Sequence, residues 1–324
     1  MRTRSGVVRP CAVALVVALL VAGSAARPAG AQPPAEGEWS IPAPLAPVSL
    51  RLDAQRRGER IVAVGERGHV LRSHDGGVGW TQERVPSRAL LTAVWMHDDR
   101  LGWAVGHDET ILRTSDGGAT WERVRFEPEA ERPLLDVWFR DADHGFAVGA
   151  YGAFLVSEDG GATWEERPIS DDDYHLNRIA VAPDGGLYLA AEAGHLYRSD
   201  DGGETWIGLE PPYQGSYFGV LPLADGSILA FGLRGHVLRS EDRGATWSEI
   251  ETGTEATLMA GVELGDGRLL LTGLAGAVLR SDDGGLSFRR DDLEDRRARV
   301  AIVPVEGAVL LFGEGGVHRL EGTP

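Results

Sequence analysis

The sequence predicts an all-β fold: a seven-bladed β-propeller of four-stranded antiparallel blades, with an N-terminal strand closing the last blade. A signature of the form Ser/Thr-x-Asp-x-Gly-x-x-Trp/Phe recurs six times, with its aspartates 41 to 43 residues apart. Short apolar segments punctuated by glycine precede each copy, and we find no convincing amphipathic helix. A period near 40 residues with about four short strands per repeat is typical of propellers.

The first 31 residues have the composition of a secretory signal peptide. Arginines precede an apolar run at Cys11–Ala22, and Ala29–Ala31 supplies a small-x-small cleavage site. We therefore assign residues 1–31 to the signal, 32–36 to a short leader and 37–322 to the propeller. An uncleaved anchor is the alternative. The signal predicts export to the periplasm, to a thylakoid lumen in a photosynthetic host, or to the medium.

Charge and cysteine content exclude several kinds of chemistry. The formal net charge is −17, which argues against a nucleic-acid partner or an anionic membrane surface, because basic side chains must neutralise phosphates there. The only cysteine is Cys11, inside the predicted signal, so the exported chain would hold no disulfide and no thiolate metal site. We predict no metal and no cofactor.

Each copy of the signature, which we call an Asp box, should close the turn between the third and fourth strands of a blade. The carboxylate and the hydroxyl can bond backbone groups of the same turn, and the glycines allow a positive φ. The final aromatic ring should pack between neighbouring sheets. The six aspartates are Asp75, Asp116, Asp159, Asp201, Asp242 and Asp283. The six aromatic residues are Trp80, Trp121, Trp164, Trp206, Trp247 and Phe288. We expect both sets to be structural.

Six boxes are compatible with seven blades because three strand-like segments follow Phe288. They are Val300–Val303, Val309–Gly313 and Gly316–Arg319, and no box or fourth strand comes after them. At the other end of the chain, Glu38–Ile41 resembles the strand that follows a box. We therefore expect the strand containing Trp39 to complete the seventh blade, which would leave no open sheet edge.

An arginine recurs just before the box in five blades. These residues are Arg72, Arg113, Arg198, Arg239 and Arg280. They could form a ring of guanidinium groups for an acidic partner, or each could stack on a tryptophan or pair with a nearby carboxylate. We favour the second interpretation, because residues fixed by a repeat usually serve the repeat.

The boxes resemble the Asp-box, or bacterial neuraminidase repeat, motif shared by sialidases and sortilin-type receptors. Extended copies such as Gly65–Trp80 and Gly149–Trp164, repeated through a lone propeller at 37–322, resemble the photosystem II assembly and stability factor family most closely. That resemblance implies a non-enzymatic assembly factor that contacts a protein partner or a membrane complex on the exported side. The motif specifies the fold well and the activity poorly.

A carbohydrate-binding or glycoside-hydrolysing propeller, similar to a sialidase, is the alternative. Sialidases carry an Arg-Ile-Pro motif near their start, whereas the nearest string here is Arg178-Ile179-Ala180 in mid-chain. Sialidases also have six blades. Two catalytic carboxylates could occur by chance in so acidic a chain, but we predict no catalytic residue and favour binding.

Residues that differ between blades are the better candidates for a binding site, because the repeat does not dictate them. The second-to-third-strand tips and the connections between blades should open on one end of the ring as a rim, and tyrosine and arginine there suit a protein interface. The candidate binding residues are Glu66, Arg67, His107, Asp108, Tyr151, Tyr174, His175, Tyr213, Tyr217 and Arg234. Plain surface is the alternative interpretation of the rim, and we expect a monomer.

Overall fold

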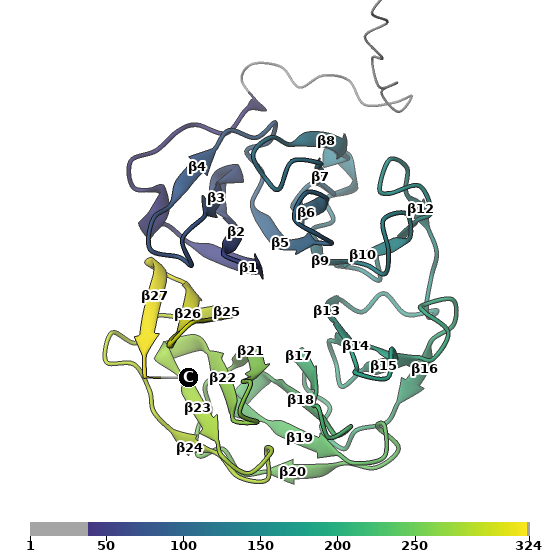
Figure 1. Cartoon of the computed structure of the whole chain (residues 1–324). Helices are drawn as coiled ribbons and strands as arrows, with labels where there is room; N and C mark the ends of the chain where they lie inside the picture. The colour runs from purple at the N-terminus through teal and green to yellow at the C-terminus, as the bar shows by residue number, and fades with distance from the viewer. Residues whose placement is uncertain (1–37, 323–324) are drawn as a thin grey trace, which may run out of the picture.

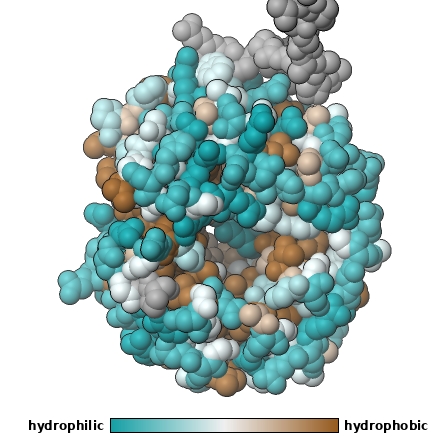
Figure 2. Space-filling view, viewed as in Figure 1, coloured by the Kyte–Doolittle hydropathy of each residue, from teal (hydrophilic) through white to brown (hydrophobic). Residues whose placement is uncertain are grey.

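The computed structural model describes residues 38–322 as a ring of seven β-sheets around a central hollow (Figures 1 and 2). Six sheets have four antiparallel strands, and the seventh has three. The predicted seven-bladed propeller is thus confirmed. The predicted signal and leader, residues 1–36, lie outside the described residues. Within 38–322 no helix is long and apolar enough to cross a membrane.

The first four blades follow the chain in order, each running from the innermost strand outward. Blade 1 has β1 (Arg51–Arg57), β2 (Arg60–Gly65), β3 (Val70–Ser73) and β4 (Thr81–Glu83). Blade 2 has β5 (Leu91–Met96), β6 (Gly102–Gly106), β7 (Ile111–Thr114) and β8 (Glu122–Arg125). Blade 3 has β9 (Leu134–Phe139), β10 (Gly145–Gly149), β11 (Phe154–Ser157) and β12 (Glu165–Glu166). Blade 4 has β13 (Leu176–Val181), β14 (Leu187–Ala191), β15 (Leu196–Ser199) and β16 (Ile207–Leu209).

The remaining blades repeat this order. Blade 5 has β17 (Tyr217–Pro222), β18 (Ile228–Gly232), β19 (Val237–Ser240) and β20 (Ser248–Ile250). Blade 6 has β21 (Leu258–Glu263), β22 (Leu269–Gly273), β23 (Val278–Ser281) and β24 (Arg289–Arg290). Blade 7 has β25 (Arg299–Val305), β26 (Ala308–Gly313) and β27 (Gly316–Glu321). Short 3₁₀ turns are η2 (Ala46–Val48), η3 (Glu66–Gly68), η4 (Pro128–Ala130), η5 (Leu233–Gly235) and η6 (Leu274–Gly276).

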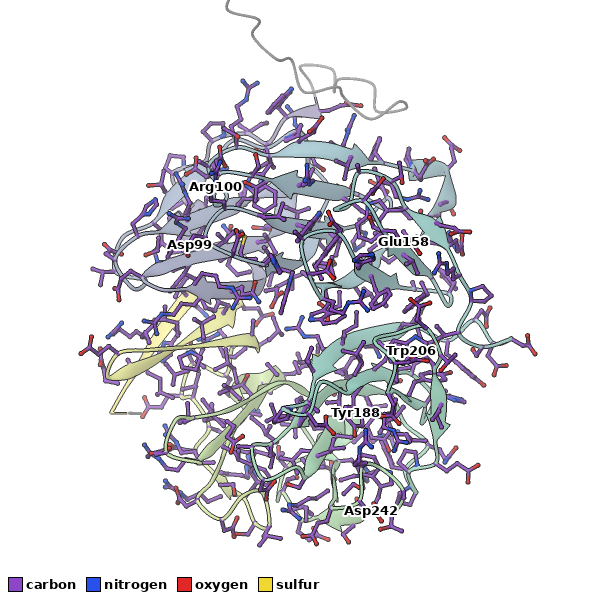
Figure 3. All side chains as sticks on the ribbon, turned by 45° about the vertical axis from the view of Figure 1, so that its right-hand side comes forward. Asp99, Arg100, Glu158, Tyr188, Trp206 and Asp242 are labelled. Carbon is purple, nitrogen blue, oxygen red and sulfur yellow. The ribbon has the colours of Figure 1, made fainter. Side chains whose placement is uncertain are left out.

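The core lies between blades, and the aromatic residue of each box packs where its own blade meets the preceding one. The ring of Trp164 meets Phe139 of its own blade edge-on with the centroids 5.7 Å apart, and Trp206 meets Phe154 of the preceding blade at 5.9 Å. Trp80 meets Phe312 of blade 7 at 6.0 Å across the point where the ring closes. Side chains fill the space between the sheets (Figure 3). Such rings bury large apolar areas in a defined geometry, which fixes the angle between blades.

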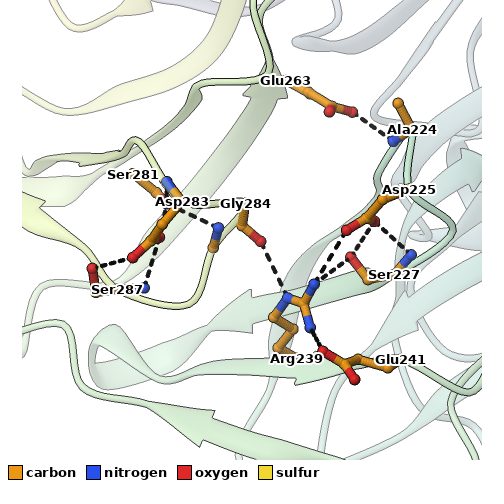
Figure 4. Close-up of polar contacts among 11 residues, drawn as sticks. Ala224, Asp225, Ser227, Arg239, Glu241, Glu263, Ser281, Asp283, Gly284 and Ser287 are labelled. Atoms are coloured by element: carbon orange, nitrogen blue, oxygen red, sulfur yellow. Dashed lines mark hydrogen bonds and ion pairs between the residues drawn. The ribbon is translucent and has the colours of Figure 1, made fainter.

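Each of the six boxes forms its own hydrogen-bond network, and the bond from the Ser or Thr hydroxyl to the Asp carboxylate recurs in all six. In the fourth box, Ser199 Oγ donates to Asp201 at 2.8 Å, and Asp201 accepts from Thr205 N at 2.9 Å and Thr205 Oγ1 at 2.6 Å. Gly203 N donates back to Ser199 Oγ at 2.8 Å. The hydroxyl-to-carboxylate distance stays between 2.7 and 3.0 Å in all six copies (Figure 4 shows Asp283). Each carboxylate therefore bonds the groups of its own turn.

The expected strand at Glu38–Ile41 is not formed, so that part of the prediction is wrong. Within 38–322 blade 7 has three strands, and no strand precedes β1. The leading segment instead lies beside blade 1, where Ser40 N donates to Val85 O at 2.9 Å. The physical reason is the proline content of the segment: Pro42 and Pro44 have no N–H group to donate to a neighbouring strand.

A buried arginine fixes the chain where the ring closes. Arg51 is 0% exposed, and its guanidinium donates to Ser49 Oγ at 2.9 Å and to Ala46 O in η2. The turn η2 lies against β27, and a side chain at Gly316 would collide with Pro47 O. The ring thus closes through a short turn packed on blade 7 instead of through a borrowed strand.

The repeated arginines are mostly engaged with carboxylates. The pairs are Arg72–Glu83, Arg198–Asp200, Arg239–Asp225 with Arg239–Glu241, and Arg280–Asp291. Arg239 also donates to Gly284 O of the next blade at 3.1 Å (Figure 4). These contacts agree with the interpretation that the arginines serve the repeat.

Candidate functional site on the variable face

The turns between second and third strands meet the connections between blades on the end of the ring opposite the boxes. Gly152 N, in the turn of blade 3, donates to Tyr174 O of the next connection at 3.0 Å. Gly194 N of blade 4 likewise donates to Gly215 O at 3.1 Å. The two predicted sets of residues therefore form one surface. We call these turns and connections the variable face.

The tips of these turns share a left-handed backbone conformation. Arg67, Asp108, Tyr151 and Arg234 occupy corresponding positions with φ between 55° and 60°. This left-handed conformation is unusual for residues with a side chain. The tips of Arg67, Tyr151 and Arg234 are exposed, and Tyr151 is 56% accessible. The variable face therefore presents different side chains from a constant backbone shape.

Tyrosine and histidine rings gather on blades 3 to 5. Tyr151 meets His175 edge-on with the centroids 5.0 Å apart. The other two contacts are stacks, Tyr174 on His195 at 4.1 Å and Tyr213 on His236 at 3.7 Å. We call these six residues the Tyr–His cluster. Except for the exposed Tyr151 they are half-buried, so the cluster offers both a rigid platform and open ring surface.

Not every predicted rim residue belongs to this cluster. Arg67 and His107 are exposed and Glu66 and Asp108 half-buried, but all four lie on blades 1 and 2. Tyr217 is 0% exposed, so the prediction that it contributes to the rim needs correction. Its hydroxyl donates to Tyr213 O at 3.0 Å, and burial raises the pKa of its phenol. From its buried position, Tyr217 therefore helps to fix the backbone at Tyr213.

The two histidines of the cluster that we did not predict, His195 and His236, carry a signal in the sequence. Each directly follows the glycine of a second-to-third-strand turn, as His69 does in blade 1. In the structure His236 pairs with Glu249, and His69 lies 3.2 Å from Ser49 Oγ. A histidine that recurs after a turn glycine was therefore a usable marker of this face.

A second group that we did not predict spans the central hollow. Arg178 Nη2, on β13, lies 3.0 Å from Asp53 Oδ1 on β1, and its Nη1 lies 3.7 Å from Asp136 on β9. Blades 1 and 4 are not neighbours, so the first pair crosses the ring (Figure 1). At the same strand position the other blades carry only Ala or Gly. These small residues leave room for the long arginine side chain.

Burial dominates the electrostatics of this cross-channel group. It raises the pKa of Asp136 to about 6, against the opposing effect of the Arg178 charge, and the nearby Asp53 raises it further. Asp136 also accepts from Ile179 N at 2.8 Å, and Asp53 from Val94 N at 3.0 Å. Both carboxylates are thus held by a cation and by the backbone of the next blade.

One more buried charge supports the variable face between blades 2 and 3. Glu109 is 0% exposed and accepts from Arg125 and from Arg132, whose Nε lies 2.8 Å from its carboxylate. Arg132 also pairs with Glu166 on the outer strand of blade 3 at 2.7 Å. Such a network locks a turn to the neighbouring blade. Within 38–322 no group of three or more metal-binding side chains is found.

The fold and the six boxes define the class of protein, a seven-bladed propeller of Asp-box repeats with one variable face. A family model described as photosynthesis system II assembly factor YCF48 matches residues 45–131 and 126–263, which is more than half of the chain. The chain belongs to this family, and the predicted resemblance is confirmed. No curated protein sequence matches it.

Solved structures agree with the fold. A structure titled "YCF48 bound to D1 peptide" is 18% identical, with a TM-score of 0.72, and covers 89% of this chain and 97% of that one. YCF48 from Cyanidioschyzon merolae is 18% identical, with a TM-score of 0.71, and the match covers 88% of this chain and 99% of that one. Virginiamycin B lyase from Staphylococcus aureus is 12% identical, with a TM-score of 0.73, and the match covers 84% of this chain and 95% of that one. Since a lyase has as high a TM-score as the two YCF48 structures, this likeness shows the fold alone.

Proposed function

We propose that the protein is an exported, non-enzymatic assembly factor that docks a protein partner through its variable face. The Tyr–His cluster is the observation that carries the proposal. It places rigid, partly exposed aromatic rings on the variable face, including the tip residue Tyr151, which the repeat does not require. Aromatic side chains that become buried on binding dominate the energetics of protein–protein interfaces.

Family membership supports the same proposal. A relative of this fold has been solved with a D1 peptide bound, which makes a polypeptide the natural ligand class for this chain as well. A partner within a membrane complex would be reached from the exported side, to which the predicted signal peptide would deliver the protein. The monomeric state is part of this proposal.

The contacts inside the ring favour binding over glycoside hydrolysis. The carboxylates of Asp53 and Asp136 both pair with Arg178, and each also accepts a hydrogen bond from a backbone N–H group. A retaining or inverting glycosidase needs one carboxylic acid and one carboxylate free to reach the sugar. Turnover of fluorogenic sialosides or glucans by the purified protein would overturn the non-enzymatic assignment.

Photocrosslinking tests the docking face directly. A photoreactive phenylalanine analogue is placed at Tyr151 on the variable face or, as a matched control, at Val78 in the first box, which is 78% exposed. Irradiation in the native host, followed by mass spectrometry, should give a discrete protein adduct from position 151 only. Equal adducts from both positions would show that the variable face has no preferred partner.

A further inference from the structure

A groove of about 640 Å³ opens on the variable face between blades 5 and 6. Its walls are the turn that follows β18, with Arg234 and His236, the connection Glu251–Glu255 that follows β20, and Arg290 on β24. The stack of Tyr213 on His236 makes the groove continuous with the Tyr–His cluster. A segment lying across the cluster could therefore continue into the groove.

The connection that forms one wall is fixed at three points. Thr252 Oγ1 donates to Gly235 O at 2.8 Å, and Arg290 Nη1 donates to Gly253 O at 2.8 Å. Gly235 packs so closely on Thr254 that an added Cβ would lie 2.1 Å from Thr254 O. A wall held in this way is already in its binding shape, which lowers the entropic cost of association.

Some charged side chains that line the groove have ion-pair partners, and others have none within 38–322. Glu249 pairs with His236, and Arg290 pairs with Asp292. Glu251 and Glu255 are exposed, and within 38–322 no ion pair engages either of them; Arg234 at the tip is likewise free of an ion pair there. The groove lining thus carries two carboxylates, on a fixed loop, and one guanidinium that make no ion pair within 38–322. The available charge is net negative, as is the whole chain at −17.

We propose that this groove binds an extended, basic segment of the protein partner, whose arginine or lysine side chains lie between Glu251 and Glu255. The proposal rests on the proposed function, since it assigns the partner chemistry of the same face. The aliphatic stem of a basic side chain would pack along the His236–Tyr213 stack while its charged end reaches the carboxylates. Arg234 would meet a carboxylate or carbonyl oxygen of the same segment.

The proposed charge complementarity should also affect the rate of association and the preference for basic over acidic segments. A strongly acidic protein attracts basic segments over several ångströms, and the effect weakens as salt screens the field. The groove would then set the register of a segment that the field has brought in. An acidic segment would be repelled by the loop even though Arg234 and Arg290 lie nearby.

Titration of the full-length protein with two small probes tests the groove. The probes are acetyl-Ala-Arg-Ala-Arg-Ala-amide and its counterpart with Glu in place of Arg, followed through the backbone amide NMR signals of Gly235, Gly253 and Thr254. We expect saturable shifts with the arginine probe only. Glu251→Gln with Glu255→Gln should weaken that binding at least about fivefold, as loss of two exposed ion pairs implies.

The matched control is Glu127→Gln with Glu129→Gln, which removes the same charge from the connection between blades 2 and 3. Its affinity for the arginine probe should stay within twofold of the wild type. Saturable binding of the glutamate probe at these amides, equal losses in both double variants, or no saturable shift would each overturn the proposal.

Failure of this inference can be told apart from failure of the proposed function. If the crosslink from Tyr151 is retained and the groove variants bind the arginine probe like wild type, docking stands and the groove assignment is wrong. If position 151 gives no discrete adduct, the docking proposal itself fails, whatever the probes do.

Discussion

Both ends of the propeller are built from turns that recur in the blades, yet the side chains of these turns have opposite roles. At the box end, Asp201 and its five counterparts use their carboxylates within their own turns. At the variable face, tips such as Arg67 and Arg234 keep a constant backbone conformation while their side chains point outward. Repetition therefore marks the residues that build the ring, and variation marks those free to bind.

The same contrast separates the aromatic residues. Trp121 at the box end is 6% exposed, and its indole N–H donates to Gly118 O at 3.0 Å. Tyr151 on the variable face is 56% exposed, and its ring meets that of His175. Aromatic rings are thus packed at the box end and, in our proposal, available for recognition at the variable face. Four predictions test this separation.

The largest expected effect is on the box end. Trp121→Ala should lower the free energy of unfolding by about 3 to 5 kcal/mol, because it leaves a cavity between blades 1 and 2. Urea denaturation measures the loss. At a temperature where the variant is still folded, crosslinking from position 151 should persist. A loss below about 1 kcal/mol would contradict the role of the box aromatic as a wedge.

The cross-channel pair should come next. Arg178→Met leaves Asp53 and Asp136 without their cation and should cost about 2 to 4 kcal/mol. Carboxyl NMR should also place the pKa of Asp136 above the value of about 6 that it has with Arg178 present. Arg167→Met, which removes exposed pairs with Glu158 and Glu165, is the control and should change stability by less than about 0.5 kcal/mol.

The raised pKa of Asp136 also predicts a pH dependence. Because the folded protein holds this proton up to about pH 6, whereas an unfolded aspartate releases it near its model value of 3.8, the group's contribution to stability is greatest below about pH 4. That contribution is lost as the pH rises to about 6. The decline, on the order of 2 kcal/mol, should be absent in Asp136→Asn. Denaturation midpoints at pH 4, 5, 6 and 7 compare the two proteins.

The smallest effect on stability should come from the variable face. Tyr151→Ala should change the free energy of unfolding by less than about 0.5 kcal/mol, because the ring is exposed. Capture of the native partner should nevertheless fall about tenfold or more if this tyrosine is an interface anchor. Unfolding and capture assays on the same preparation decide between the two roles. A stability loss above 1 kcal/mol would assign Tyr151 to the fold.

The position of the leading segment shows where sequence similarity stops being informative. Glu38–Ile41 matches the strand after a box in its residues, but the prolines that follow cannot complete a ladder of hydrogen bonds. Arg51, in a position where five blades carry a buried Leu or Tyr, instead anchors η2 against blade 7. The arginine was visible in the sequence, but its partners Ala46 and Ser49 became apparent only in the folded ring.

The sequence by itself determined the blade count, the turn chemistry of Asp75 to Asp283, and which end of the ring varies, because these depend on contacts within one repeat of about 40 residues. Only the tertiary structure decided that Arg178 meets Asp53 across the ring, that Tyr217 is buried, and that Tyr213 stacks on His236. Such contacts join blades at angles and distances that local sequence does not encode. They form only when the ring closes, and the repeat pattern in the sequence does not specify the angles between blades that decide which residues then meet.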